Sequence, residues 1–375
     1  MKRALTVAFI AAVAAMLGCD GGAHANPARV IARDIDPITS SDWSDFSGLN
    51  ITKKLPQPRS FEYHARVKYN DKEGMLVCTT LKFKTERMKH VAKHLSKGIN
   101  RPGLAIVSAD SFPKLEGTMM VKGHYCTLTT WPKSMSLKEY VRNKRPEERD
   151  RVLPAIFVQV ISALSYLQSM GFIYNYINIE SIMIRSNMAS EVPEVIVADL
   201  HYISGKYGVL KTGEYATIRS GDEPESFENE RGYRPPEDYK DSDTLVSKEK
   251  VTSWMLGATI YDSLAGMPPY GFTKSLNGTV PWKDAKLKQV MEDLRKFGKN
   301  TYPPAETSNN HLATLMKTLL NCDPRARPAI SKLNLQLIRE LAGGSGVKIA
   351  IGFTATDMWS FFKLAVRTVN PFTRN

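Results

Sequence analysis

Cysteine is scarce in this chain, and its placement argues against a disulfide-stabilised fold. There are 4 cysteines among 375 residues. Cys19 lies in an N-terminal segment that we expect to be removed, which leaves Cys78, Cys126 and Cys322. An odd number without regular spacing does not indicate a disulfide framework, and the Cys and His residues lack the spacing of a structural zinc site. We therefore expect a fold held by an apolar core, which 42% hydrophobic residues can supply.

Long apolar runs are also scarce. The uncharged stretch 4–18 follows Lys2 and Arg3 and precedes a small-residue site at 23–25. It is too short to span a membrane, and its flanks are those of a secretory signal peptide. We predict that residues 1–25 are cleaved and that the protein is secreted, with no later segment long enough to span a membrane. The sequons at Asn50 and Asn277 are then candidates for glycosylation.

Acidic residues are few in one part of the chain. The net charge is +13, and residues 51–100 hold twelve Lys and Arg against four Asp and Glu. A solvated basic face would account for this excess. The functional alternative is contact with an anionic membrane or an acidic protein partner. No nucleic-acid-binding motif is visible, so we expect no nucleic acid partner.

Hydrophobic patterning divides the rest of the chain. The pattern predicts an irregular extension over 26–59, a small sheet-rich unit over 60–132 and a mainly helical unit over 133–341. In the final part, 342–375, apolar residues within 357–366 share one helical face. That face suits docking on the protein's own core, which we favour, or contact with a membrane surface or a partner. The expected strands are 61–69, 75–83, 118–122, 125–130 and 195–198, and the expected helices are 86–97, 153–170, 251–264, 312–320 and 331–341.

Several motifs follow one another along the helical unit. A polar turn after helix 153–170 holds Tyr174, Asn175 and Tyr176, and a strand then ends at Asp199. The later members are Arg234-Pro235-Pro236-Glu237, Trp254 and Gly257 on one helix, Pro268-Pro269, and Arg327. This order resembles the C-lobe of protein kinases. The resemblance implies an α+β, two-lobed kinase-like fold with a small antiparallel β N-lobe and a larger helical C-lobe.

A narrower resemblance is carried by two further segments. Phe83-Lys84-Thr85-Glu86-Arg87 and Arg234-Pro235-Pro236-Glu237 are similar to the secreted rhoptry and dense-granule kinases of apicomplexan parasites such as Toxoplasma. Residues 51–73 contain no glycine, as in the subgroup that lacks the Gly-rich loop, where another structure is expected to replace the first strand. Gly74 then reads as part of a hairpin turn. The resemblance implies a dense-granule, parasitophorous-vacuole or cyst location.

The residues that carry phosphoryl transfer in kinases are altered here. The strand Lys aligns with Thr80, and a rival alignment offers Lys82; with Thr80, Cys78 would face the adenine pocket. In the H-R-D-x-x-x-x-N pattern the matching residues are Tyr174, Asn175, Tyr176 and Ser181, and Asn178 replaces the usual Lys. Tyrosine, with a pKa near 10, is a poor proton acceptor at neutral pH.

Some positions of the family pattern are kept. Asp199 stands at the metal-binding Asp and could hold a divalent ion weakly, although capping the strand end is an equal alternative. His201 reads as a solvated loop residue. Glu237 and Arg327 match the Glu–Arg pair of the family, and Trp254 and Gly257 match its central helix, where Thr252 replaces the usual Asp.

These positions predict a pseudokinase: no catalytic residues, no cofactor, doubtful binding of ATP and Mg²⁺, and a role as scaffold, allosteric or structural partner in a parasite vacuole or cyst. The alternative is an atypical kinase-like enzyme with a rewired nucleotide site that uses Asp199 and a base such as Glu180 or Lys82.

Overall fold

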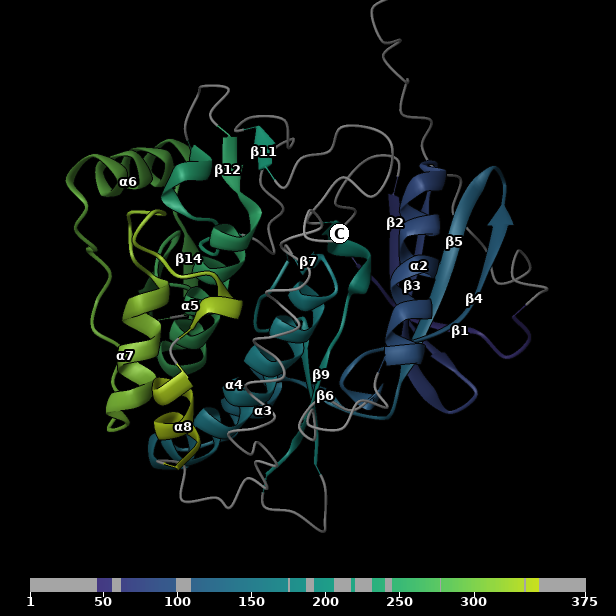
Figure 1. The fold of residues 1–375 in the computed structure, drawn as a ribbon, viewed down its shortest axis with the longest axis horizontal. Coiled ribbons are helices and arrows are strands. Elements are labelled where there is room, and N and C mark those ends of the chain that lie inside the picture. The colour runs from purple at the N-terminus through teal and green to yellow at the C-terminus, as the bar shows by residue number, and fades with distance from the viewer. Residues whose placement is uncertain are drawn as a thin grey trace, which may run out of the picture.

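The computed structural model shows two lobes that follow one another in sequence (Figure 1). It describes residues 46–55, 62–98, 109–174, 176–186, 192–205, 217–219, 231–239, 245–276, 278–333 and 335–343. The predictions for the signal peptide, for Asn175, for Asn277 and for the C-terminal tail fall outside these residues. Asn50 is described and exposed at the start of a strand.

The N-lobe is built around one antiparallel sheet of five strands. Its order is β1-β2-β3-β5-β4. Two-residue turns at Asn70-Asp71 and at Lys122-Gly123, with positive φ at every residue, join β2 to β3 and β4 to β5. Such turns match the twist of paired strands. The bounds are β1 Asn50–Lys54, β2 Glu62–Tyr69, β3 Lys72–Thr79, β4 Lys114–Val121 and β5 His124–Trp131, and helix α2, Lys82–Gly98, lies against the sheet (Figure 1).

Three expectations for this lobe are wrong. The first strand is not replaced, because β1 pairs with β2 in the same sheet. The expected strand 75–83 ends at Thr79, and α2 starts at Lys82. Gly74 lies inside β3 and not in a turn; a Cβ there would come within 2.4 Å of the Thr129 carbonyl oxygen. Glycine therefore allows β3 and β5 to approach each other closely.

A disulfide joins the two central strands, contrary to the expectation from the cysteine count. Cys78 on β3 and Cys126 on β5 are directly opposite in the strand register and are bonded to each other. Both side chains are fully buried, in a cluster on the sheet face that includes Tyr63 and Leu128. The odd cysteine is Cys322, which is buried and free.

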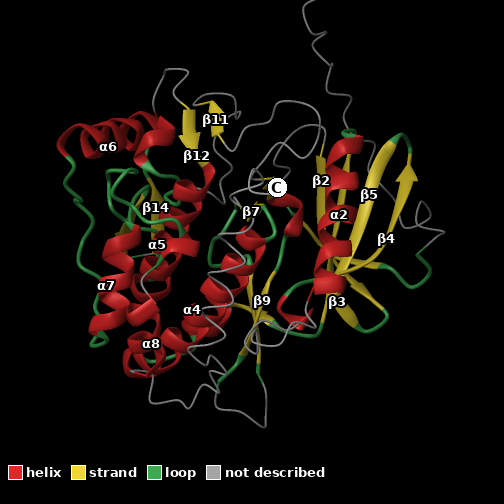
Figure 2. Cartoon of the chain, in the orientation of Figure 1, coloured by secondary structure: helices red, strands yellow, loops and turns green. Residues whose placement is uncertain are grey.

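The C-lobe is mainly helical and contains the largest apolar core (Figure 2). α4 and α5 are its most deeply buried long helices. α4 is long and apolar enough to cross a membrane by length and composition alone, but most of its apolar window is buried inside the protein, as in a core helix. The bounds are α3 Leu137–Arg142, α4 Pro146–Ser169, α5 Lys248–Ala265, α6 Asp284–Phe297, α7 Asn310–Leu319 and α8 Leu335–Gly343.

Short strands and 3₁₀ turns position the loops between these helices. β6 (Met135–Ser136), β8 (Ile182–Arg185) and β9 (Glu194–Val197) form one small sheet. β7 (Phe172–Tyr174) pairs with β10 (Ile203–Gly205), which follows the turn η3 (Leu200–Tyr202). The remaining elements are β11 Thr217–Arg219 paired with β12 Leu245–Ser247, β13 Phe272–Ser275 paired with β14 Gly278–Pro281, η2 Ala109–Ser111, η5 Pro236–Tyr239 and η6 Ile330–Lys332. The α+β fold with a sheet-based N-lobe and a helical C-lobe is confirmed.

Candidate functional site: the cleft between the lobes

The inner face of the N-lobe sheet packs directly on the C-lobe. Met75 and Val77 of β3 share a buried cluster with Met183 of β8 and Ile196 of β9. Side chains alternate between the two faces of a strand, so Cys78 points to the opposite face, where its disulfide lies. The expectation that Cys78 faces the adenine pocket is therefore wrong.

The same alternation of side chains identifies the residue of β3 that faces the cleft, where kinases carry a Lys. Thr80 is exposed and lies just beyond the end of β3, and Lys82 is exposed at the first position of α2. Thr79 shares the inner face with Val77 and is 2% exposed. Its Oγ1 accepts a hydrogen bond of 3.1 Å from the Leu81 N–H. β3 therefore presents a hydroxyl, and no ammonium group, to the cleft.

An ion pair of reversed sign connects the sheet to α2. In kinases a strand Lys pairs with a Glu of this helix. Here the carboxylate is on the sheet, at Glu62 of β2, and the ammonium is on the helix, at Lys84, and the two are in contact. Glu62 also lies 3.2 Å from His64 Nε2. Although burial opposes ionisation, these two partners lower the pKa of Glu62 to about 2.

The catalytic-loop position is filled by aromatic rings. Tyr176, at the place of the catalytic Asp, is buried and stacks on Tyr202 of η3, with ring centroids 3.9 Å apart and planes at 22°. Tyr174 is buried and donates a hydrogen bond of 2.6 Å to the Ala198 carbonyl oxygen. Burial and the nearby Asp199 raise the pKa of Tyr174 well above its usual value, so it stays neutral. Neither ring supplies a base.

The next two altered positions bond to each other. The Asn178 side-chain oxygen accepts from the N–H groups of Glu180, at 2.8 Å, and Ser181, at 2.9 Å. The Ser181 hydroxyl donates to the Asn178 carbonyl and accepts from the Asn178 N–H, both at 3.0 Å. Ser181 is fully buried. Its oxygen serves to close this turn, which makes it a poor metal ligand.

Asp199 is the acidic group that remains at the family's metal position. It has a left-handed backbone, with φ of 61°, and is 6% exposed. Within the described residues, its Oδ1 has no hydrogen-bond partner. Burial raises its pKa above the usual value, and the charge of Arg66 opposes that rise. A single carboxylate whose ionisation is disfavoured would hold a divalent cation weakly.

Side chains of β2 reach across the cleft to the C-lobe. The rings of His64 and His201 meet edge to face at 4.7 Å, and His201 lies against Tyr202 at 4.1 Å. Arg66 Nη2 donates to the Glu180 carbonyl oxygen at 3.4 Å. Burial and nearby positive groups hold the pKa of His201 well below its usual range, so this ring is neutral. His201 is thus a bridging residue and not the solvated loop residue that was expected.

These inner-face residues could have been found in the sequence. Glu62, His64 and Arg66 recur at every second position of a predicted strand, which places three polar side chains on one face. A sheet face lined in this way indicates a polar contact with the other lobe. Tyr202, in contrast, belongs to no sequence pattern that would predict its place in the cleft.

The family's structural positions make close contacts. Arg327 is fully buried and bonds Glu237 through two nitrogens, at 2.6 and 3.1 Å. Its guanidinium also lies 4.9 Å from the centroid of the Trp254 ring. A Cβ on Gly257 would come within 2.9 Å of Leu319, so glycine allows α5 and α7 to pack closely. The Thr252 hydroxyl donates a hydrogen bond of 2.8 Å to the Tyr174 carbonyl oxygen, which connects the catalytic loop to α5.

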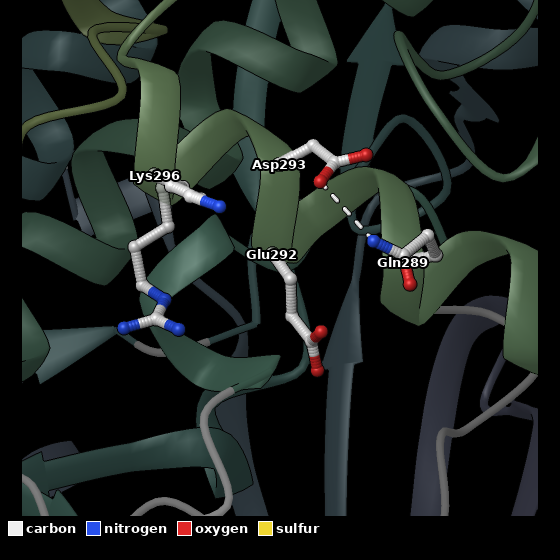
Figure 3. Close-up of a pocket in the computed structure, with 5 residues that line it drawn as sticks. Gln289, Glu292, Asp293 and Lys296 are labelled. Carbon is white, nitrogen blue, oxygen red and sulfur yellow. Dashed lines mark hydrogen bonds between the residues drawn. The ribbon is translucent and has the colours of Figure 1, made fainter.

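A depression on the opposite side of the C-lobe is formed by α6. Figure 3 shows Gln289, Glu292, Asp293 and Lys296 along this helix, with Gln289 bonded to Asp293. These side chains are polar or charged and follow one solvent-facing surface, which is ordinary for an amphipathic helix. We assign no chemistry to them.

A comparison with models of protein families identifies the family of this fold. The model of the protein kinase domain matches residues 107–336. The chain belongs to the protein kinase family. A search of curated proteins finds no match. The matched range begins after β1, β2, β3 and α2, the part in which the family carries its Gly-rich loop and strand Lys.

ATP and Mg²⁺, which the family implies, do not fit the residues present. The connection between β1 and β2, residues 55–61, has no glycine. The inner face of β3 carries Thr79 in place of Lys, and the Ser181 hydroxyl is already bonded. Asp199 offers one unpartnered carboxylate oxygen among the described residues, which alone is too few ligands for Mg²⁺. We therefore derive no phosphoryl-transfer step for this chain.

Proposed function

We propose that this protein is a catalytically inactive kinase-like protein, a pseudokinase, that acts as a scaffold or allosteric partner for other proteins. The observation that carries the proposal is the cleft, in which the stacked pair Tyr176–Tyr202 and the contact His64–His201 lie between the lobes. Rings that pack there compete with a nucleotide for the same space. A kinase fold without its chemistry retains large surfaces for binding.

We further propose that the protein works outside the reducing cytosol. The disulfide between Cys78 and Cys126 supports this proposal, because such bonds persist in oxidising compartments. The signal-peptide pattern of residues 1–25 points to the same route. The resemblance to secreted parasite kinases leads us to propose a dense granule, vacuole or cyst as the destination.

The basic N-lobe is our candidate surface for an anionic partner. Lys53 and Lys54 of β1 and Lys68 of β2 are exposed on neighbouring strands. Other basic residues of this lobe are already paired, such as Lys72 with Glu116 at 3.3 Å. We expect Lys53→Glu and Lys54→Glu together to abolish salt-sensitive binding to an acidic partner or to anionic vesicles.

The decisive experiment measures nucleotide binding and phosphate transfer by the secreted protein. We expect no rise in melting temperature with ATP and Mg²⁺ and no phosphorylation of a general substrate. Asp199→Asn is the matched variant, because its unpartnered oxygen is the feature that favours the alternative of a rewired enzyme. A rise in melting temperature or a turnover that disappears in Asp199→Asn would establish that alternative and overturn the proposal.

A further inference from the structure

Two histidines lie one turn apart on α2, where both rings contact Phe172 of the C-lobe. His90 and His94 are both exposed, and their ring centroids are 4.2 Å apart with planes at 49°. Residues four apart in a helix share a face, and this spacing lets two imidazoles reach one ion. The pair is separate from the cleft residues described above.

The hydrogen bonding of His94 leaves a nitrogen for a metal. Its Nδ1 lies 2.9 Å from the His90 carbonyl oxygen. A carbonyl only accepts, so Nδ1 carries the proton and the Nε2 lone pair remains available. A histidine that binds a metal through one ring nitrogen usually donates a hydrogen bond from the other, often to a backbone carbonyl.

Phe172 fixes the orientation of both rings. It is buried at the start of β7, and the rings of His90 and His94 meet it edge to face at 5.8 and 5.7 Å. Imidazole binds metal ions in its neutral form.

We propose that His90 and His94 chelate a divalent transition metal ion such as Zn²⁺. Among the described residues, no group of three His, Cys, Asp or Glu side chains converges on one ion. The two imidazoles are therefore the protein ligands, and water fills the other positions. Affinity should follow the usual order for nitrogen ligands, with Cu²⁺ above Ni²⁺ and Zn²⁺. The ion links successive turns of α2, so it binds the folded helix in preference to the unfolded chain.

The test uses the full mature chain without a histidine tag, stripped with a chelator and titrated with ZnCl₂ or NiCl₂ at neutral pH. We expect one ion per chain and a melting temperature that rises with metal. His90→Gln and His94→Gln should each weaken binding at least tenfold, because one imidazole alone does not chelate. Binding should also weaken in acid, because protons compete with the metal ion for the imidazole nitrogens.

The control replaces two half-buried histidines outside α2, His124 and His311, by Gln in one variant. This variant should bind like the wild type. Three outcomes would overturn the proposal: no binding, binding that persists when His90 and His94 are both replaced, or a loss of only about twofold in each single variant, which indicates independent histidines. Circular dichroism of each variant verifies that α2 and the rest of the fold are retained.

Discussion

The reversed ion pair between Glu62 and Lys84 makes stability depend on pH in a defined way. A carboxyl group whose pKa falls from 4.5 to about 2 on folding contributes about 3 kcal/mol at neutral pH. The contribution is complete above pH 4.5, because the group is then ionised in both states. It is lost as the pH falls toward 2, where the folded protein also takes up the proton. Glu62 is 3% exposed, so water screens this interaction little.

Glu62→Gln tests this reasoning. The amide keeps the shape and one hydrogen-bonding oxygen but removes the charge. In urea unfolding at pH 7, we expect the free energy of unfolding to be lower by about 2–3 kcal/mol than in the wild type. The difference should shrink steadily at pH 4 and pH 3. Glu86→Gln is the matched control, since Glu86 pairs with Lys89 on the exposed side of the same helix and should matter by less than about 1 kcal/mol. A difference that stays constant from pH 7 to pH 3 would refute the argument.

Three other changes test the rest of the structure. Burial raises the pKa of Asp262 to about 6. Ionisation of Asp262 therefore lowers the free energy of unfolding as the pH rises from about 4 through 6. Asp262→Asn should remove this part of the pH dependence in thermal melts. Arg327→Ala leaves the Glu237 carboxylate buried without its partner and should cost about 3–5 kcal/mol in urea unfolding; a cost below 1 kcal/mol would contradict a buried pair. Replacing Cys78 and Cys126 together by Ala should lower the free energy of unfolding by about 2–4 kcal/mol and leave it insensitive to reductant, whereas an unchanged value would argue against the disulfide.

The catalytic loop could be interpreted from sequence because its register is fixed locally. Tyr176 and Ser181 lie in one short segment that runs without a gap into the buried strand β8. The Cys78–Cys126 bond could not be predicted in this way, because it depends on how β3 and β5 align across a separation of 48 residues. Counting cysteines over the whole chain gave the opposite answer.

The strand Lys position shows a second limit of sequence reasoning. Thr79 and Thr80 differ by one residue, but a shift of one residue moves a side chain to the other face of a strand. Only the pairing of β3 with its neighbours distinguishes them. The partnership of Glu62 with Lys84 was also out of reach, because it joins a strand to a helix through tertiary packing.

The reversed pair also has an evolutionary consequence. Thr79 lies directly opposite Glu62 in the register of β2 and β3. A mutation that restored Lys at this position would place the new ammonium beside Glu62, which would bind it in competition with any phosphate. Lys84 would then lose its partner, and Glu86 of α2 lies on the exposed side of the helix, where it pairs with Lys89. Restoring the kinase ion pair between β3 and α2 therefore needs substitutions on β2, β3 and α2 together.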